Sequence, residues 1–187
     1  MEEKEHVLEV LSKVKTAIKN NDSAEIKNLS DNIIHECLIN QDPDSIAIAV
    51  ILYSLSKITE RRSYHDYKNW NKFYKNYIFS IDKLIEYLKN NKIEEFRQEI
   101  EFLRRLIQKL SGNLKQHMQE VFRRAEINKA SRIYEHGISM EKTASILGIS
   151  VWELAEYAGK TGIGDVNLGI TLPVKSRIKL AEEIFKK

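Results

Sequence analysis

A short stretch in the C-terminal third of this 187-residue chain carries the side chains best placed for molecular recognition. At helical spacing, its outward positions are Ser150, Val151, Trp152, Ala155, Glu156 and Lys160. A helix that reads the major groove of DNA usually offers Arg, Lys, Asn or Gln near its N-terminus, and here only Lys160, at the far end, is basic. Glu153 and Glu156 would repel phosphates, whereas an exposed Trp152 suits a protein interface. Two uses of this face stay open, contact with DNA and docking of a partner.

The element that positions these residues is a pair of short helices within 139–161, with the spacing of a helix-turn-helix. Ala144 is small enough to let the two helices cross closely, and Gly148 can adopt the positive φ that the turn requires. Ser150 is the expected N-cap of the second helix, and Glu153, three residues later, completes a capping box. The expected buried face consists of Leu147, Ile149, Leu154 and Tyr157.

Residues 129–157 read Lys-Ala-Ser-Arg-Ile-Tyr-Glu-His-Gly-Ile-Ser-Met-Glu-Lys-Thr-Ala-Ser-Ile-Leu-Gly-Ile-Ser-Val-Trp-Glu-Leu-Ala-Glu-Tyr. This run resembles small prokaryotic helix-turn-helix proteins, antitoxins or regulators that are encoded beside PIN-domain ribonucleases. The likeness covers residues 129–161, and the first 110 residues match no family pattern. It implies a regulator that binds DNA, a toxin nuclease, or both.

Basic residues elsewhere in the chain offer further contacts. Arg123 and Arg124 precede the helix pair and are the expected phosphate anchors if DNA is bound, with surface solubility as the alternative. The stretch 61–79 mixes cations with aromatic residues, a combination that can stack on nucleic acid. On a helical wheel one arc holds the aromatics Tyr67, Trp70, Phe73, Tyr74 and Tyr77, and the lysines fall opposite. We therefore expect the aromatics in the core and a secondary basic face made of Lys68, Lys72 and Lys75.

Patterns typical of catalysis or metal binding are missing from the sequence. His35 and Cys37 lack the second ligand pair that a tetrahedral zinc site requires. Residues 159–161 end like a phosphate-binding loop, but Leu154 stands where the first glycine of that loop belongs. The Arg-to-His spacing typical of HEPN ribonucleases is also not met. We expect no catalytic residues, no cofactor and no metal.

Glycine divides the chain, since none occurs before Gly112 and all seven lie from there onward. Polar turns and capping signals such as Asp22 with Glu25 predict helices near 3–19, 23–39, 45–60, 65–89, 93–110, 113–135, 140–147 and 151–159, and a closing helix after 171. We find no strand-like alternation and no internal repeat. The expected fold is all-α, with a helical bundle for assembly or partner binding (1–112) and a helix-turn-helix domain with a closing C-terminal helix (113–187).

Composition limits the class of protein. With 42% hydrophobic and 30% charged residues the chain is typical of a globular protein. Its longest apolar run, residues 46–53, is far shorter than the roughly 20 residues of a membrane span. The N-terminus has no targeting stretch, so a cytoplasmic location is expected. Residues 111–187 carry 12 basic and 9 acidic residues against 18 and 18 before them, so the net charge of +3 lies in the half of the chain that contains the helix pair.

These features predict a non-enzymatic, antitoxin-like transcription regulator that binds double-stranded DNA. A homodimer is expected, because one half-site rarely gives enough affinity and specificity. The alternative is an adaptor in which the helix-turn-helix is a packing or docking unit, and whose surface binds structured RNA or a protein such as a toxin nuclease.

Overall fold

A computed structural model describes residues 3–37, 42–110, 112–135, 138–147 and 149–161. These residues form eight α-helices and one 3-10 helix, without a strand, which confirms the all-α expectation for the described part of the chain. In chain order the elements are α1 (Lys4–Lys19), α2 (Ser23–Cys37), α3 (Pro43–Glu60), the 3-10 helix η1 (Arg62–Asp66), α4 (Trp70–Lys89), α5 (Ile93–Gln108), α6 (Gly112–Glu135), α7 (Met140–Leu147) and α8 (Val151–Thr161).

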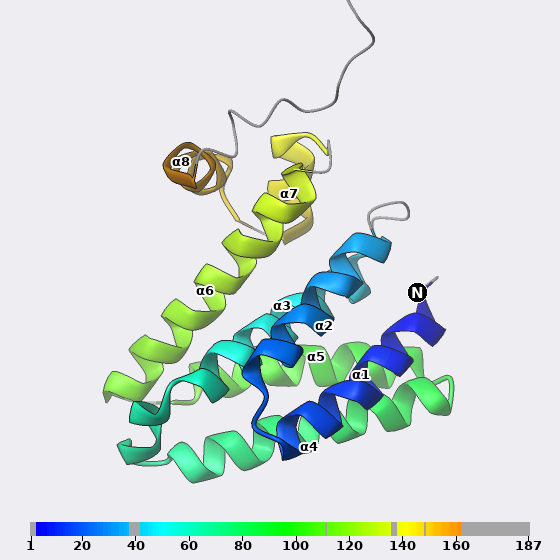
Figure 1. Ribbon diagram of the computed structural model, residues 1–187, viewed down its shortest axis with the longest axis vertical. Helices are drawn as coiled ribbons and strands as arrows, with labels where there is room; N and C mark the ends of the chain where they lie inside the picture. Colours follow the sequence, from blue (N-terminus) through cyan, green and yellow to red (C-terminus); the bar gives the residue numbers. More distant parts are fainter. Residues whose placement is uncertain (1–2, 38–41, 111, 136–137, 148, 162–187) are drawn as a thin grey trace, which may run out of the picture.

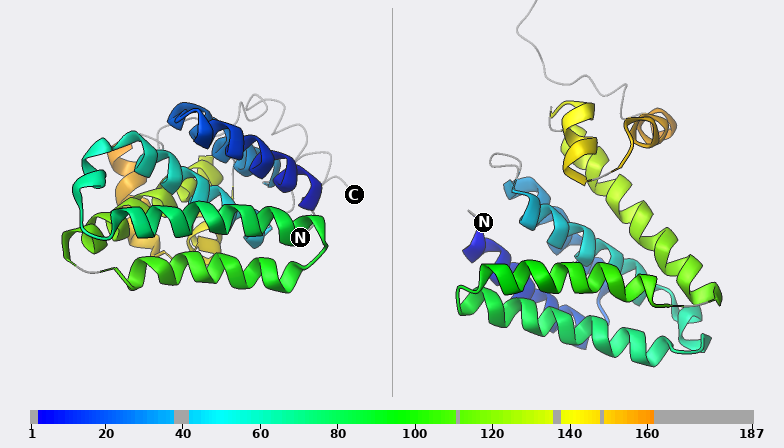
Figure 2. Two further views of the ribbon diagram at one scale, coloured as in Figure 1. Left: turned by 90° about the horizontal axis from the view of Figure 1, so that it is seen from below. Right: turned by 180° about the vertical axis from the view of Figure 1, so that it is seen from behind.

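Helices α1 to α5 form a bundle, and the long α6 runs diagonally along it, packed mainly on α3 (Figures 1 and 2). The short helices α7 and α8 pack on each other and on the C-terminal part of α6. Within the described residues, none of the helices has both the length and the apolar character that crossing a bilayer requires.

Helix α3 is the central element of the core. Its apolar run is buried from Ile46 to Leu52, as its sequence predicts, and it packs between α2 and α6. Helix α6 adds Leu114, Met118, Val121, Phe122 and Ile133 to the hydrophobic core built by α1 to α5. The core is therefore continuous across residue 112, and the division into domains 1–112 and 113–187 stays a prediction.

One expected helix start is wrong, and a second differs from the expectation by two residues. Helix α4 begins at Trp70, not near residue 65, because Asn69 adopts a left-handed conformation (φ 72°) that interrupts the helix after η1. Helix α3 begins at Pro43, where proline is favoured in the first turn, with Asp42 as N-cap. The Asp42 carboxylate accepts hydrogen bonds from Asp44 N (3.3 Å) and Ser45 Oγ (2.7 Å). The predicted closing C-terminal helix lies outside the described residues.

The expectation of no internal repeat is also wrong, because the α1–α2 and α4–α5 hairpins are equivalent at an offset of 70 positions. Both turns contain a Lys-Asn-Asn sequence whose last residue, Asn21 or Asn91, has a positive φ of 51° or 57°. The next residue in each turn, Asp22 or Lys92, donates its backbone N–H to the carbonyl oxygen five residues earlier, at 2.9 Å in the first turn and 2.8 Å in the second. Asparagine tolerates this left-handed conformation better than most residues.

Buried positions repeat with the same offset. In α2 they include Ile26, Leu29, Ser30 and Ile33, and in α5 they include Phe96, Glu99, Ile100 and Leu103. The repeat escaped sequence inspection because burial constrains polarity and volume at these positions more than residue identity. One difference stands out: Val10 and Leu29 in the first hairpin correspond to Ser80 and Glu99 in the second.

The second hairpin therefore holds a buried polar pair where the first is apolar. Ser80 Oγ donates to Glu99 Oε1 at 2.6 Å, and Glu99 is only 6% exposed. We expect Ser80→Val to destabilise the chain by about 1–3 kcal/mol, because a buried carboxylate loses a donor. The double variant Ser80→Val/Glu99→Leu copies the first hairpin and should return to within about 1 kcal/mol of the parent in urea unfolding. A double variant as unstable as the single one would contradict this equivalence.

Candidate nucleic-acid interface

Helix α8 is anchored by one buried side. Leu154 is fully buried and Ala158 is 3% exposed, where α8 packs on α6 and α7. On α7, Ala144 is 2% exposed, as expected for a small residue at a close crossing. Leu147, Ile149 and Tyr157 are half-buried and form the edge of this contact. Gly148 lies outside the described residues, so its expected positive φ stays a prediction.

The predicted capping box at the start of α8 is confirmed. Glu153 N donates to Ser150 Oγ at 3.2 Å, and Ser150 N donates to Glu153 Oε2 at 3.0 Å. Ser139 caps α7 in a similar way, since its Oγ accepts a hydrogen bond from Lys142 N at 3.2 Å. These caps satisfy backbone donors that a helix leaves unpaired in its first turn.

The first turn of α8 is also tied to α6 by an ion pair. The Arg123 guanidinium pairs with Glu153 Oε1, while the other oxygen of the same carboxylate serves the capping box. Arg124 Nε lies 2.5 Å from Glu120, one turn earlier on α6. Both arginine side chains remain more than half exposed, at 61% and 70%. Arg123 thus positions α8, and its role as a phosphate anchor stays a prediction.

The outward face of α8 is open to solvent. Trp152 is 85% exposed and Val151 38%, while Ser150, Glu156 and Lys160 are also exposed. Ala155 is half-buried beside them. Lys160 Nζ pairs with Glu156 one turn earlier, and this hydrogen bond and the lysine charge lower the pKa of the Glu156 carboxyl. The structure therefore leaves the predicted residues of α8 accessible to solvent, with Ala155 the least exposed of them.

The secondary basic face differs from its expected form. Lys72 and Lys75 are exposed on α4, but Lys68 is exposed in the segment before that helix, so the three lysines do not share one helical row. The aromatic side chains opposite them are core residues, as predicted: Trp70, Phe73 and Tyr77 are 3%, 2% and 0% exposed. Tyr67 and Tyr74 are half-buried.

Sequence inspection missed a buried ion pair that joins α6 to the bundle. Lys129 is fully buried, and its Nζ lies 2.6 Å from Asp31 on α2 and 4.6 Å from the centre of the Tyr53 ring. Burial lowers the pKa of the Lys129 ammonium, an effect that Asp31 partly offsets. The position could have been found, because Lys129 lies on the helical stripe of Phe122, Ala125 and Ile133.

Within the part of the chain that the structure describes, His, Cys, Asp and Glu residues do not gather in groups of three or more that could hold a metal ion. Comparison with protein-family models, curated proteins and solved structures finds no match to this chain.

Proposed function

We propose that the chain is a non-enzymatic DNA-binding regulator of antitoxin-like type, which acts as a homodimer and places α8 in the major groove. The observation that carries this proposal is the two-sided character of α8. Leu154 and the Arg123–Glu153 ion pair fix one side to α6, while Trp152 and Val151 face solvent on the other. A recognition helix needs both a rigid attachment and an open face.

The ion pairs of α8 answer the main objection to this function, which is repulsion between its carboxylates and DNA. Glu153 is paired with Arg123, and Glu156 is paired with Lys160. Each negative charge is therefore offset locally, and its field falls off over a shorter distance than that of an isolated carboxylate. The likeness of residues 129–161 to antitoxin-type regulators supports the same proposal.

The chemistry of the α8 tip sets the kind of DNA site. Val151 and Ala155 are apolar side chains of the type that contacts the thymine methyl group, whereas the Ser150 hydroxyl is engaged in the helix cap, where it accepts from Glu153 N and donates to Glu153 Oε2. The first turn offers no Arg or Lys to read guanine. We therefore propose a preference for A·T-containing sites, with the affinity supplied mainly by phosphate contacts.

A charge variant tests this function. Glu156→Gln removes a negative charge from the outward face and releases Lys160, so affinity for duplex DNA should rise about 3- to 10-fold at low salt. The matched control is Glu9→Gln, because Glu9 on α1 forms the same type of exposed pair with Lys13, at 2.6 Å.

The measurement is fluorescence anisotropy of a labelled duplex across a salt series. The parent protein should bind with an affinity that falls steeply as salt rises, and the Glu9→Gln variant should match it. Duplex affinity that is absent at low salt, or equal gains in both variants, would count against a DNA-binding α8.

The exposed Trp152 favours a second function, an adaptor that docks a protein such as a toxin nuclease. A tryptophan that is 85% exposed beside an exposed valine is typical of the anchor residues at protein interfaces. If the chain is an adaptor, the parent protein should show no salt-sensitive affinity for DNA. Trp152→Ala should then weaken the affinity for the purified protein partner at least 10-fold in isothermal titration. Unchanged complex affinity in that variant would exclude docking through this surface.

A further inference from the structure

A cleft of about 630 Å³ lies between the C-terminal half of α3 and α6. Its lining includes Lys57 and Arg61 at the end of α3, and His117 and Arg124 on α6. Arg61, His117 and Arg124 are exposed and Lys57 is half-buried, so all four side chains are open to solvent. Two separate elements therefore bring N–H donors to one concave surface.

The basic side chains of the cleft form only weak ion pairs with the carboxylates beside them. Lys57 Nζ lies 2.8 Å from Glu60, and Arg124 Nε lies 2.5 Å from Glu120. Both pairs join neighbours on one helix and are open to solvent on at least one side, so water and salt screen them and they contribute little to stability. With Arg61 the cleft has three basic side chains against two carboxylates, and a phosphate can take the place of either carboxylate at small cost.

Aromatic rings support the two remaining donors. Arg61 Nη1 donates to the Tyr64 hydroxyl at 2.9 Å, and the His117 ring lies 5.8 Å from the Tyr64 ring and 5.4 Å from the Tyr67 ring. A guanidinium has five N–H donors, so the bond to Tyr64 leaves donors available for a phosphate. Packing against rings limits the conformations of Arg61 and His117, which lowers the entropy lost when they bind.

The cleft and the attachment of α8 use neighbouring residues of α6. Arg124 follows Arg123, whose guanidinium holds the first turn of α8. Burial raises the pKa of Tyr53, which lines the cleft, and Tyr157 of α8 is close enough to contribute to that shift. Both α8 and η1 lie toward the same side of the molecule (Figures 1 and 2). A strand of DNA that passes α8 can therefore continue along α6 toward η1.

We propose that this cleft binds backbone phosphates of the DNA strand that flanks the groove occupied by α8, with Lys57, Arg61 and Arg124 as the contacting cations. This inference rests on the proposed function and adds a second contact surface to it. The phosphate contacts would supply the affinity that the sparsely basic α8 lacks.

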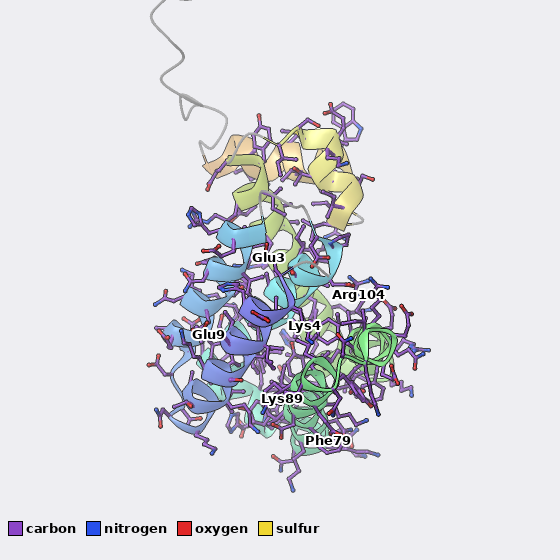
Figure 3. All side chains as sticks on the ribbon, turned by 90° about the vertical axis from the view of Figure 1, so that its right-hand side faces the viewer. Glu3, Lys4, Glu9, Phe79, Lys89 and Arg104 are labelled. Atoms are coloured by element: carbon purple, nitrogen blue, oxygen red, sulfur yellow. The ribbon has the colours of Figure 1, made fainter. Side chains whose placement is uncertain are left out.

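The test compares two triple variants in full-length protein by anisotropy of a labelled duplex across a salt series. Lys57→Ala/Arg61→Ala/Arg124→Ala should lower duplex affinity at least 30-fold near 100 mM salt. It should also reduce the slope of log K against log salt by about 2–3, since each lost phosphate contact removes roughly 0.9. The control, Lys13→Ala/Lys89→Ala/Lys92→Ala, removes the same charge from α1 and the α4–α5 hairpin. Figure 3 views the molecule from the side away from α8 and shows Lys89 and the Glu9 partner of Lys13 there.

In the control variant, the slope of log K against log salt should stay within about one unit of the parent value. Equal losses of duplex affinity in the two triple variants would overturn the proposed phosphate site, because they would show a general effect of net charge. A third variant, Lys57→Arg/Arg61→Lys/Arg124→Lys, keeps all three charges and should retain most of the slope. Loss of the slope in this variant would also overturn the proposal.

Free phosphate provides a separate arm. Inorganic phosphate and a nucleoside triphosphate should show no saturable binding below about 1 mM in isothermal titration. The reason is that the affinity for DNA comes from several phosphates linked in one strand, and a free phosphate makes only one of these contacts. Tight nucleotide binding that the cleft variant abolishes, with duplex binding unchanged, would identify a nucleotide pocket and overturn the proposal. A parent protein without any duplex affinity would instead refute the proposed function itself.

Discussion

Asp31→Ala is expected to lower the free energy of unfolding by about 3 kcal/mol, because it leaves the fully buried Lys129 ammonium without its carboxylate. Lys129→Met should change stability by no more than about 1 kcal/mol, since it removes the buried charge and keeps most of the side-chain volume. The Asp31 side chain that it leaves behind is 34% exposed and can be hydrated. Urea unfolding at neutral pH measures both values.

The two variants should also differ in their response to pH. Burial lowers the pKa of Lys129 in the folded state, so the unfolded chain binds more protons between the folded and unfolded pKa values. Stability from this residue therefore rises with pH in that alkaline window. Asp31→Ala removes the partner that offsets this lowering, so the variant should regain part of its lost stability as the pH rises toward the ordinary lysine pKa. Lys129→Met should show no such gain, and an equal gain in both variants would refute the assignment to Lys129.

Leu154→Ala and Trp152→Ala should differ strongly in their effect on stability, although the two residues are two positions apart on α8. Leu154 is fully buried against α6 and α7, and its truncation should cost about 2–5 kcal/mol of the docking free energy of α8. Trp152 is 85% exposed, so its truncation should change stability by less than about 0.5 kcal/mol. Duplex affinity should fall in both, in the first because α8 detaches and in the second because a contact is lost.

Hydrogen exchange distinguishes these causes. Amides of α8 should exchange at least 10-fold faster in Leu154→Ala and at the parent rate in Trp152→Ala. Faster exchange throughout α8 in the Trp152 variant would mean that this tryptophan holds the helix in place, and its use as a contact residue would be wrong.

Local signals in the sequence predicted most of the elements and part of the site. The capping box of Ser150 and Glu153 depends on residues three positions apart, and the buried stripe of α4 depends on helical periodicity, so both can be derived from spacing alone. The solvent-exposed face around Trp152 was predicted in the same way. Each of these features is confirmed by hydrogen bonds or burial in the structure.

Features that depend on distant residues could not be derived in that way. Arg123 and Glu153 are 30 positions apart, and Lys129 and Asp31 are 98 apart, so their pairing is set by how α6 packs against other helices. The α3–α6 cleft has the same origin. The break before α4 was missed for a local reason, because the positive φ of Asn69 is accessible to asparagine but is not specified by it.

Quenching of Trp152 fluorescence by acrylamide tests most directly whether α8 enters DNA. The chain has two tryptophans, of which Trp70 is 3% exposed and Trp152 is 85% exposed, so the quenchable emission belongs to Trp152, and Trp152→Phe confirms the assignment. We expect a saturating duplex to reduce the quenching constant of Trp152 at least threefold, because the groove would shield the indole ring. A duplex that binds fully while Trp152 stays as quenchable as in the free protein would show that DNA contacts another surface.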